Sequence, residues 1–232
     1  MVGGEGSDRG MEQILGRMLR TLERKVDPSH TALIVVDVQN DFCSKGGAFD
    51  RDGADLTRMT DMFPRLIDFI EMARKMKLLI IFVQSIYTTQ SNSYLSDVWV
   101  EHYIRMGKGR FTEYPALEEG SWGADFCKGF KPLPEEVVVK KHRYSAFLDT
   151  DLDLILRSKG IRTLIMTGVA TNVCVEMTAR IGFLKDYYIV LLKDCTATIS
   201  EELHKNALRN IETHYGIVVD SGEVLDCWGN LK

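Results

Sequence analysis

The stretch that decides the fold class is TLIMTGVATNVCVEMTAR, residues 163–180. Its apolar part, residues 163–167, is too short for a helix and does not alternate, which is typical of a strand buried on both faces of a parallel sheet. Gly168 ends this run, and a helix-like segment follows from about residue 172 to residue 185. Cys174 therefore stands where a buried strand passes into a helix.

The same alternation of short apolar runs and helical patterns extends along most of the chain. Helices with one apolar face are expected at residues 62–76, 151–159, 172–185 and 201–214. Strands are expected at residues 32–36, 78–84, 137–140, 163–167, 188–192 and 217–220. Strands that alternate with helices predict right-handed βαβ units. We therefore expect an α/β fold with three layers, αβα, around a central, mainly parallel sheet.

The chain is expected to divide into an N-terminal extension, residues 1–28, and one domain, residues 29–232. The extension starts with a Gly-rich, polar segment, residues 1–10, that we expect to be disordered, and it continues with helical spacing over residues 11–25. Within the domain, residues 44–53 read as a loop, and residues 85–134 are irregular and rich in aromatic side chains. This aromatic segment could act as a lid, as a subunit interface or as both.

The composition is that of an ordinary globular protein, since 45% of the 232 residues are hydrophobic and 27% are charged. There are 29 basic and 33 acidic residues, a net charge of -4, without a Lys/Arg cluster, so no nucleic-acid partner is expected. The first residues lack the apolar core of a signal peptide, and no apolar run approaches the roughly 20 residues of a membrane helix. We therefore expect a cytoplasmic protein with no membrane partner.

The five cysteines are odd in number, widely spread and without a CxxC pair. This pattern disfavours both a disulfide framework and a zinc knuckle. Taken singly, each cysteine is expected to be an inert buried thiol.

Chemically capable side chains gather just after the predicted strands. Asp37, Lys141 and Cys174 each follow an apolar run, as do the pairs 84–85 and 194–195. Each of the first three has an ordinary explanation when taken alone: a cap, a solvated charge and a small packed residue. Because ligands of parallel sheets bind beyond the carboxyl ends of the strands, their coincidence predicts a shared cleft.

An acid, a lysine and a thiol in one cleft can carry out nucleophilic catalysis. A helix N-terminus and a nearby ammonium group are expected to favour the thiolate of Cys174. Asp37 can accept the thiol proton and later deliver it to a departing amine. The turn at residues 168–171 could donate backbone N–H groups to the oxyanion. The pattern thus indicates attack on an amide or ureido carbonyl.

Three motifs resemble the isochorismatase-like cysteine hydrolases: DVQNDF at 37–42, KKHRYSAF at 140–147 and TGVATNVCVEMTAR at 167–180. The resemblance covers roughly residues 31–220. It implies a catalytic triad of Asp37, Lys141 and Cys174. It also implies a cis peptide between Val169 and Ala170, and an oxyanion hole made of the amides of Ala170 and Cys174.

Within this family, the chain most resembles ureidoacrylate amidohydrolases of pyrimidine degradation, on residues 143–164, 167–176 and 207–216. It departs from them in an insert around residues 94–112 and in its N-terminal extension. Hydrolysis of biuret, triuret, N-carbamoylsarcosine or maleamate remains open. A non-catalytic binding protein on the same fold is also conceivable, although the intact triad disfavours it.

Two other subgroups are disfavoured by single features. Nicotinamidases of the family bind a metal through a D-x-H…H cluster, whereas residues 84–95 contain no histidine, so neither a metal nor another cofactor is expected. True isochorismatases lack the nucleophilic cysteine.

The expected partner is a small amide or ureido substrate, and the resemblance implies a homo-oligomer, either a dimer or a tetramer. Glu176, two residues past the cysteine, is expected to be a charge on a helix surface or interface. Six residues near the motifs are candidates for substrate binding: Phe42, Gln84, Tyr87, Trp122, Tyr144 and Asn172.

Overall fold

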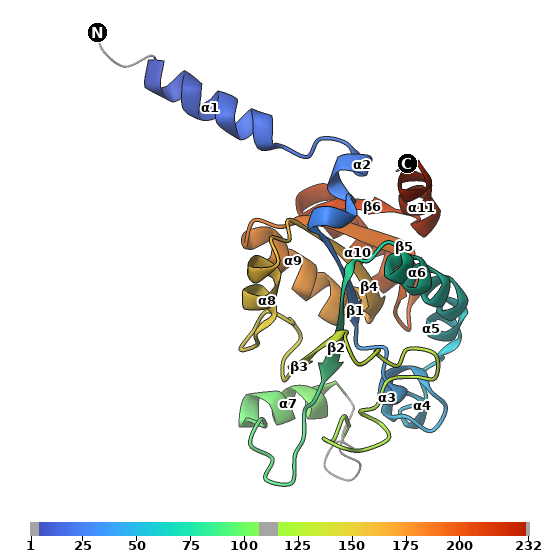
Figure 1. Cartoon of the computed structure of the whole chain (residues 1–232). Coiled ribbons are helices and arrows are strands. Elements are labelled where there is room, and N and C mark those ends of the chain that lie inside the picture. Colours follow the sequence, from blue (N-terminus) through green and yellow to red (C-terminus); the bar gives the residue numbers. More distant parts are fainter. Residues whose placement is uncertain (1–4, 107–115, 231–232) are drawn as a thin grey trace.

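The computed structural model describes residues 5–106 and 116–230, which form helices around one sheet (Figure 1). The strands are β1 (Thr31–Val36), β2 (Leu79–Ser85), β3 (Val137–Lys141), β4 (Thr163–Val169), β5 (Tyr188–Ala197) and β6 (Ile217–Val219). The longer helices are α1 (Glu5–Arg17), α6 (Phe63–Lys75), α7 (Asp97–Arg105), α8 (Leu152–Ser158), α9 (Glu176–Leu184), α10 (Glu201–His214) and α11 (Ser221–Gly229). Shorter helical segments are α2 (Leu22–Lys25), η1 (Pro28–His30), α3 (Asn40–Cys43), α4 (Ala48–Arg51), α5 (Thr57–Asp61) and η3 (Thr171–Val175).

The six strands lie in the order β3-β2-β1-β4-β5-β6, and every neighbouring pair is parallel. All six strands expected from the sequence are confirmed. The order reverses at β1, whose neighbours β2 and β4 lead to opposite halves of the sheet. Such a reversal opens a crevice at the carboxyl ends of the strands.

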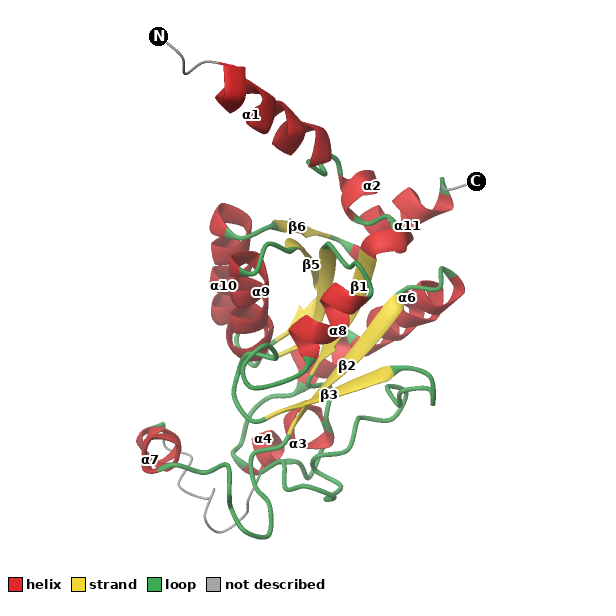
Figure 2. Cartoon of the chain, turned by 60° about the vertical axis from the view of Figure 1, so that its left-hand side comes forward, coloured by secondary structure: helices red, strands yellow, loops and turns green. Residues whose placement is uncertain are grey.

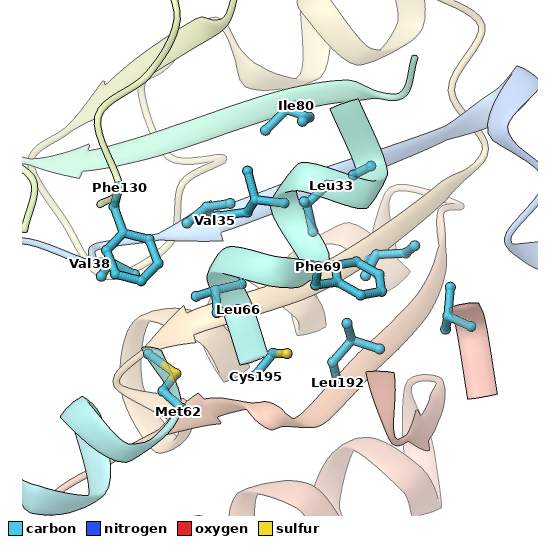
Figure 3. Close-up of a cluster of buried hydrophobic side chains, with 14 of the residues drawn as sticks. Leu33, Val35, Val38, Met62, Leu66, Phe69, Ile80, Phe130, Leu192 and Cys195 are labelled. Carbon is cyan, nitrogen blue, oxygen red and sulfur yellow. The ribbon is translucent and has the colours of Figure 1, made fainter. Parts of the chain in front are cut away.

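Helices cover both faces of the sheet, as Figure 2 shows, so the expected three-layer architecture is confirmed. On one face, α6 buries Leu66, Phe69 and Ala73 against Leu33 and Val35 of β1 (Figure 3). The helix-period spacing of these α6 residues places them on one side of the helix. Trp228 of α11 extends this layer, because its ring lies 5.2 Å from the ring of Phe69, centroid to centroid.

The opposite face of the sheet is covered by α8, α9 and α10. Leu156 of α8, Ala179 of α9 and Ile211 of α10 pack against Ile34 and the other residues of β1 that point to this side. Because strand residues alternate between faces, β1 contributes Leu33 and Val35 to one core and Ile34 to the other. The second core also contains Cys174, which places the thiol on this side of the sheet.

Strand β5 is longer than its apolar run suggested. It extends to Ala197, so Asp194 and Cys195 lie within the strand and not beyond its end. Cys195 packs in the core beside α6, and Asp194 accepts hydrogen bonds from the backbone N and the hydroxyl of Ser221, at 2.8 and 2.6 Å. Asp194 therefore anchors the start of α11, and Cys195 is part of the core. Neither residue lies at the end of its strand, where the cleft is expected.

The N-terminal extension differs from the expectation in its details. Helix α1 begins at Glu5, within the segment expected to be disordered, and ends at Arg17, so residues 11–25 form two helices and not one. In Figure 1, α1 projects away from the domain, and its side chains from Gly10 to Arg17 are exposed. Residues 1–4 lie outside the described residues.

The irregular segment and the loop at residues 44–53 also contain helices that the sequence analysis did not predict. These are α7 in the first and α4 in the second. Residues 107–115 lie outside the described residues. Across the part of the chain that the structure describes, no helix is both long enough and apolar enough to cross a membrane.

Gly168 is needed where β4 approaches β1. Its φ is +98°, and a Cβ atom there would lie 2.1 Å from the carbonyl oxygen of Val36. We expect Gly168→Ala to lower the free energy of unfolding by at least about 2 kcal/mol, because it adds both a backbone clash and a strained φ. Urea denaturation followed by circular dichroism measures this change.

The matched control is Gly222→Ala in α11, where an added Cβ atom meets nothing within 4 Å. There, alanine is expected to be neutral or stabilising by about 0.5–1 kcal/mol. Equal stability of the two variants would contradict the role given to Gly168.

Candidate active site

Asp37 is held at the carboxyl end of β1, at the centre of the sheet. Its backbone N donates to the carbonyl oxygen of Val83 in β2 at 3.0 Å, so the β1–β2 pairing continues through it. Its φ is +53°, a left-handed conformation that aspartate tolerates better than most residues. The side chain is fully buried, at 0% exposure. The strand thus delivers a carboxylate to a dry position in the crevice.

Lys141 ends the edge strand β3 and reaches inward beneath the end of β2. Lys141 and Val139 are two residues apart in the strand, so their side chains point to the same face of the sheet. Val139 lies in the core on the Cys174 side. The Lys141 ammonium nitrogen lies 2.8 Å from Asp37 Oδ2, 3.3 Å from Cys174 Sγ and 2.6 Å from Ser85 Oγ. Like Asp37, the lysine side chain is fully buried, at 0% exposure.

Cys174 lies in η3, a π-helical turn between β4 and α9, so it precedes the α-helix and is not its first residue. Its exposure is 4%. Lys141 therefore contacts both the Asp37 carboxylate and the Cys174 thiol. The three groups come from three separate strand ends, as the sequence predicted. The peptide bond between Val169 and Ala170 is cis.

Burial decides the protonation of the thiol. It raises the pKa of Cys174 to about 12; Lys141 acts in the opposite direction, and Asp37 adds to the rise. The expectation of a thiolate favoured by the helix and the lysine is therefore wrong for the free protein. Cys174 is a thiol at neutral pH, and its proton must be removed when it reacts.

The lysine, by contrast, stays charged. Burial alone would lower the pKa of Lys141, but Asp37 and then Cys174 outweigh it, so the pKa is raised. Among the described residues, neither oxygen of Asp37 accepts an aligned hydrogen bond, although Lys141 lies close to one of them. The carboxylate thus retains the capacity to take a proton.

Ser85 and Gln39 fix the ends of the strands around this cluster. The side chain of Gln39 accepts from the backbone N of Ser85 at 2.8 Å and donates to its carbonyl at 3.0 Å. The same amide group donates to the carbonyl oxygen of Ala124 at 2.7 Å. Gln39 therefore joins β1, β2 and the loop around residue 124, and it keeps the Ser85 hydroxyl beside Lys141.

A cavity of about 440 Å³ opens onto Cys174. Four of the six candidates for substrate binding line it: Phe42, Tyr87, Tyr144 and Asn172. Ala170, the second residue assigned to the oxyanion hole, lines it as well. Burial raises the pKa values of Tyr87 and Tyr144, so both present neutral hydroxyl groups. Asn172 Oδ1 is buried and has no hydrogen-bond partner among the described residues.

Gln84 and Trp122 are not among the described residues that line this cavity. Gln84 lies on the opposite face of β2 from Ser85, and its amide group donates to the carbonyl oxygen of Ala124 at 2.9 Å. Trp122 is 53% exposed, and its backbone carbonyl accepts from the side-chain amide of Asn40 at 2.8 Å. Neighbouring residues of a strand point to opposite faces, and in β2 it is Ser85, not Gln84, that points toward Lys141.

The remaining lining residues were missed or assigned elsewhere. Glu176, expected at a surface or interface, is 8% exposed and lines the cavity. Its neighbours at helical spacing, Val173, Met177 and Arg180, line it too, which one face of a helix explains. The lining is completed by Phe49 and by residues of α7 and its C-terminal end: His102, Tyr103 and Met106.

Helix α7 makes a polar contact with the site. His102 Nε2 lies 3.0 Å from the hydroxyl of Tyr144, which follows the catalytic-motif lysine by three residues. The aromatic segment therefore contributes cavity wall, as a lid would. Among the described residues, no group of three or more His, Cys, Asp or Glu side chains could hold a metal ion.

The raised pKa of Cys174 gives a direct test. Iodoacetamide should alkylate Cys174 at a rate that rises about tenfold per pH unit from pH 7 to pH 10, because the thiolate fraction grows throughout that range. Peptide mass spectrometry gives the rate for each cysteine. The buried Cys43 and Cys195, whose pKa values burial also raises, serve as internal controls and should react later. A Cys174 rate that levels off by pH 8 would mean that the thiolate forms near neutral pH.

Comparison with known proteins places the chain in a family. Residues 31–223 match the isochorismatase domain. An isochorismatase-like hydrolase from Alkaliphilus metalliredigens is 27% identical, with 86% of this chain and 96% of that chain covered and a TM-score of 0.68. A cysteine hydrolase from Pseudomonas syringae pv. phaseolicola 1448A is 26% identical, with 90% of this chain and 98% of that chain covered and a TM-score of 0.76. An N-carbamoylsarcosine amidase from Thermoplasma acidophilum is 25% identical, with 83% of this chain and 96% of that chain covered and a TM-score of 0.64. The chain belongs to the isochorismatase family.

Proposed function

We propose that this protein is a metal-independent cysteine amidohydrolase that cleaves the C–N bond of a linear ureido or amide substrate through a thioester. The observation that carries the proposal is the buried cluster in which Lys141 Nζ lies 2.8 Å from Asp37 Oδ2 and 3.3 Å from Cys174 Sγ. Its thiol opens onto a cavity of about 440 Å³, which is large enough for a small molecule.

In the first half of the reaction, Cys174 Sγ attacks the carbonyl carbon while Asp37 takes the thiol proton. The negative charge moves to the carbonyl oxygen, and the backbone N–H groups of Ala170 and Cys174 stabilise it. The C–N bond then breaks, and Asp37 gives its proton to the departing nitrogen. Ammonia or an amine leaves, and the acyl group stays on sulfur as a thioester.

In the second half, Asp37 removes a proton from a water molecule that attacks the thioester. The C–S bond breaks, the sulfur recovers the proton, and the acid is released. From a ureido substrate this acid is a carbamate, which decomposes to carbon dioxide and an amine or ammonia. Lys141 remains an ammonium group throughout and offsets the charge that passes between Asp37 and the sulfur.

The composition of the cavity suits a ureido group beside an apolar wall. Asn172 and the neutral hydroxyl groups of Tyr87 and Tyr144 line the cavity, and such groups can exchange hydrogen bonds with a ureido group. Ureidoacrylate is our first candidate because the resemblance at residues 143–164 and 207–216 extends beyond the triad. The N-carbamoylsarcosine amidase among the similar structures supports linear ureido compounds as a class. Biuret is the next candidate.

We also propose that the protein is a homo-oligomer. Leu154 of α8 and Phe183 and Leu184 of α9 are 69%, 44% and 69% exposed, and such exposed apolar side chains are ones that a second copy could cover. Light scattering gives the mass in solution directly, for comparison with the 26.3 kDa of one chain.

The test of the reaction is ammonia release from ureidoacrylate, biuret, N-carbamoylsarcosine and nicotinamide by the wild type and by Cys174→Ser. Activity on at least one ureido compound is expected, with a loss on the order of 1,000-fold in the variant, because serine is a much weaker nucleophile in this setting. Cys227→Ser, which changes a cysteine far from the cavity, is the matched control and should keep full activity.

Activity that survives in Cys174→Ser would contradict the mechanism. Activity on nicotinamide alone would contradict the ureido assignment. A wild type that releases no ammonia from any compound would contradict the substrate assignment.

A further inference from the structure

The Glu176 carboxylate is held in the wall of the cavity by donors that all bond to one of its oxygens. Arg180 Nε and Nη2 both donate to Glu176 Oε1, the first at 3.1 Å. Asn210 Nδ2 of α10 donates to the same oxygen at 3.0 Å. Three N–H groups from two helices therefore fix the rotamer of a side chain that is only 10% exposed.

The second oxygen, Oε2, has no such partner. No donor among the described residues bonds to it. Oε2 is also absent from the unpartnered polar atoms that are fully buried, so it keeps some contact with solvent. Glu176 is largely buried and lines the cavity that opens onto Cys174, so the cavity is where Oε2 meets solvent. An oriented, charged acceptor thus faces the space that a substrate would fill.

The charge of this acceptor is already balanced. Arg180 pairs with Glu176, and its remaining Nη1 donates to the Tyr215 hydroxyl at 3.3 Å. The pair therefore adds little net charge to the cavity, and what it offers a ligand is an acceptor for hydrogen bonds.

We propose that Glu176 is a substrate-binding residue that selects ureides and amides with a free N–H next to the scissile carbonyl, by accepting that N–H on Oε2. This inference rests on the function proposed above and names the substrate class of that same cavity. Esters and fully N-substituted amides offer no donor to Glu176 and should bind less well.

The structure suggests an unusually clean variant, Glu176→Gln. Arg180 and Asn210 present only donors to the Oε1 position, so the glutamine must place its carbonyl oxygen there. Its NH₂ group then occupies the position of Oε2. The packing and the inner hydrogen bonds persist, while the group that faces the cavity changes from an acceptor to a donor.

Binding is measured by calorimetry in a Cys174→Ala background, so that turnover does not interfere. The probes are N-carbamoylglycine and two analogues, N-carbamoylsarcosine, with a methyl group on the inner nitrogen, and the analogue with two methyl groups on the outer nitrogen. Glu176→Gln should weaken N-carbamoylglycine about tenfold or more, since a charge-assisted hydrogen bond is lost. For the analogue that lacks the contacting N–H, this loss should disappear.

The control is Asp153→Asn in the same background. Asp153 of α8 pairs with Arg157 at i,i+4 and with Lys185, as Glu176 pairs with Arg180, but it is not among the residues that line the cavity. It should leave all three affinities unchanged. Thermal unfolding confirms that each variant is folded.

Three results would overturn the inference: unchanged affinity for N-carbamoylglycine in Glu176→Gln, an equal loss for all three probes, and no binding of any probe to Cys174→Ala. Failure of the proposed reaction looks different. In that case the probes bind and respond to Glu176→Gln, yet wild-type protein releases no ammonia from ureido compounds.

Discussion

The ion pair between Lys141 and Asp37 is the interaction on which the site depends. Both side chains are at 0% exposure, and the removal of two charges from water is costly unless they meet in good geometry. Here β1 supplies the carboxylate, β3 supplies the ammonium group, and Ser85 at the end of β2 supplies a further hydrogen bond. Three neighbouring parallel strands must end in register for the pair to form, so the register of the sheet and the chemistry of the site are linked.

The same burial determines how the nucleophile works. A dry environment raises the pKa of Cys174 to about 12, and the nearby ammonium group only partly offsets this. Under the proposed mechanism, the thiol stays unreactive until an electrophile arrives and Asp37 takes the proton in the same step. The base, Asp37, and its counter-charge, the Lys141 ammonium group, lie next to each other and beside the thiol. This arrangement limits side reactions of the cysteine when the cavity holds no substrate.

The sequence predicted the sheet and the convergence of Asp37, Lys141 and Cys174 because both follow from local patterns. Uninterrupted apolar runs marked six strands, and the residues that ended them marked the crevice. The chemistry of the Gln84 amide suits the expected substrate, but the pleat of β2 points this side chain to the face away from the cavity. Glu176 seemed a surface charge because its partners Arg180 and Asn210 are recognisable only once α9 and α10 are packed together. The contribution of α7 to the cavity is likewise a tertiary contact, made through His102 and Tyr144.

Covalent catalysis by the buried cluster of Asp37, Lys141 and Cys174 can be tested by trapping the intermediate. Wild-type protein is mixed with a turned-over ureido substrate, quenched in acid within milliseconds and digested for mass spectrometry. An added acyl mass is expected on the peptide that contains Cys174 and on no other peptide. In Asp37→Asn this added mass should be absent, because the thiol proton is then not removed. Turnover without any mass on Cys174, or with equal trapping in Asp37→Asn, would contradict covalent catalysis by this cluster.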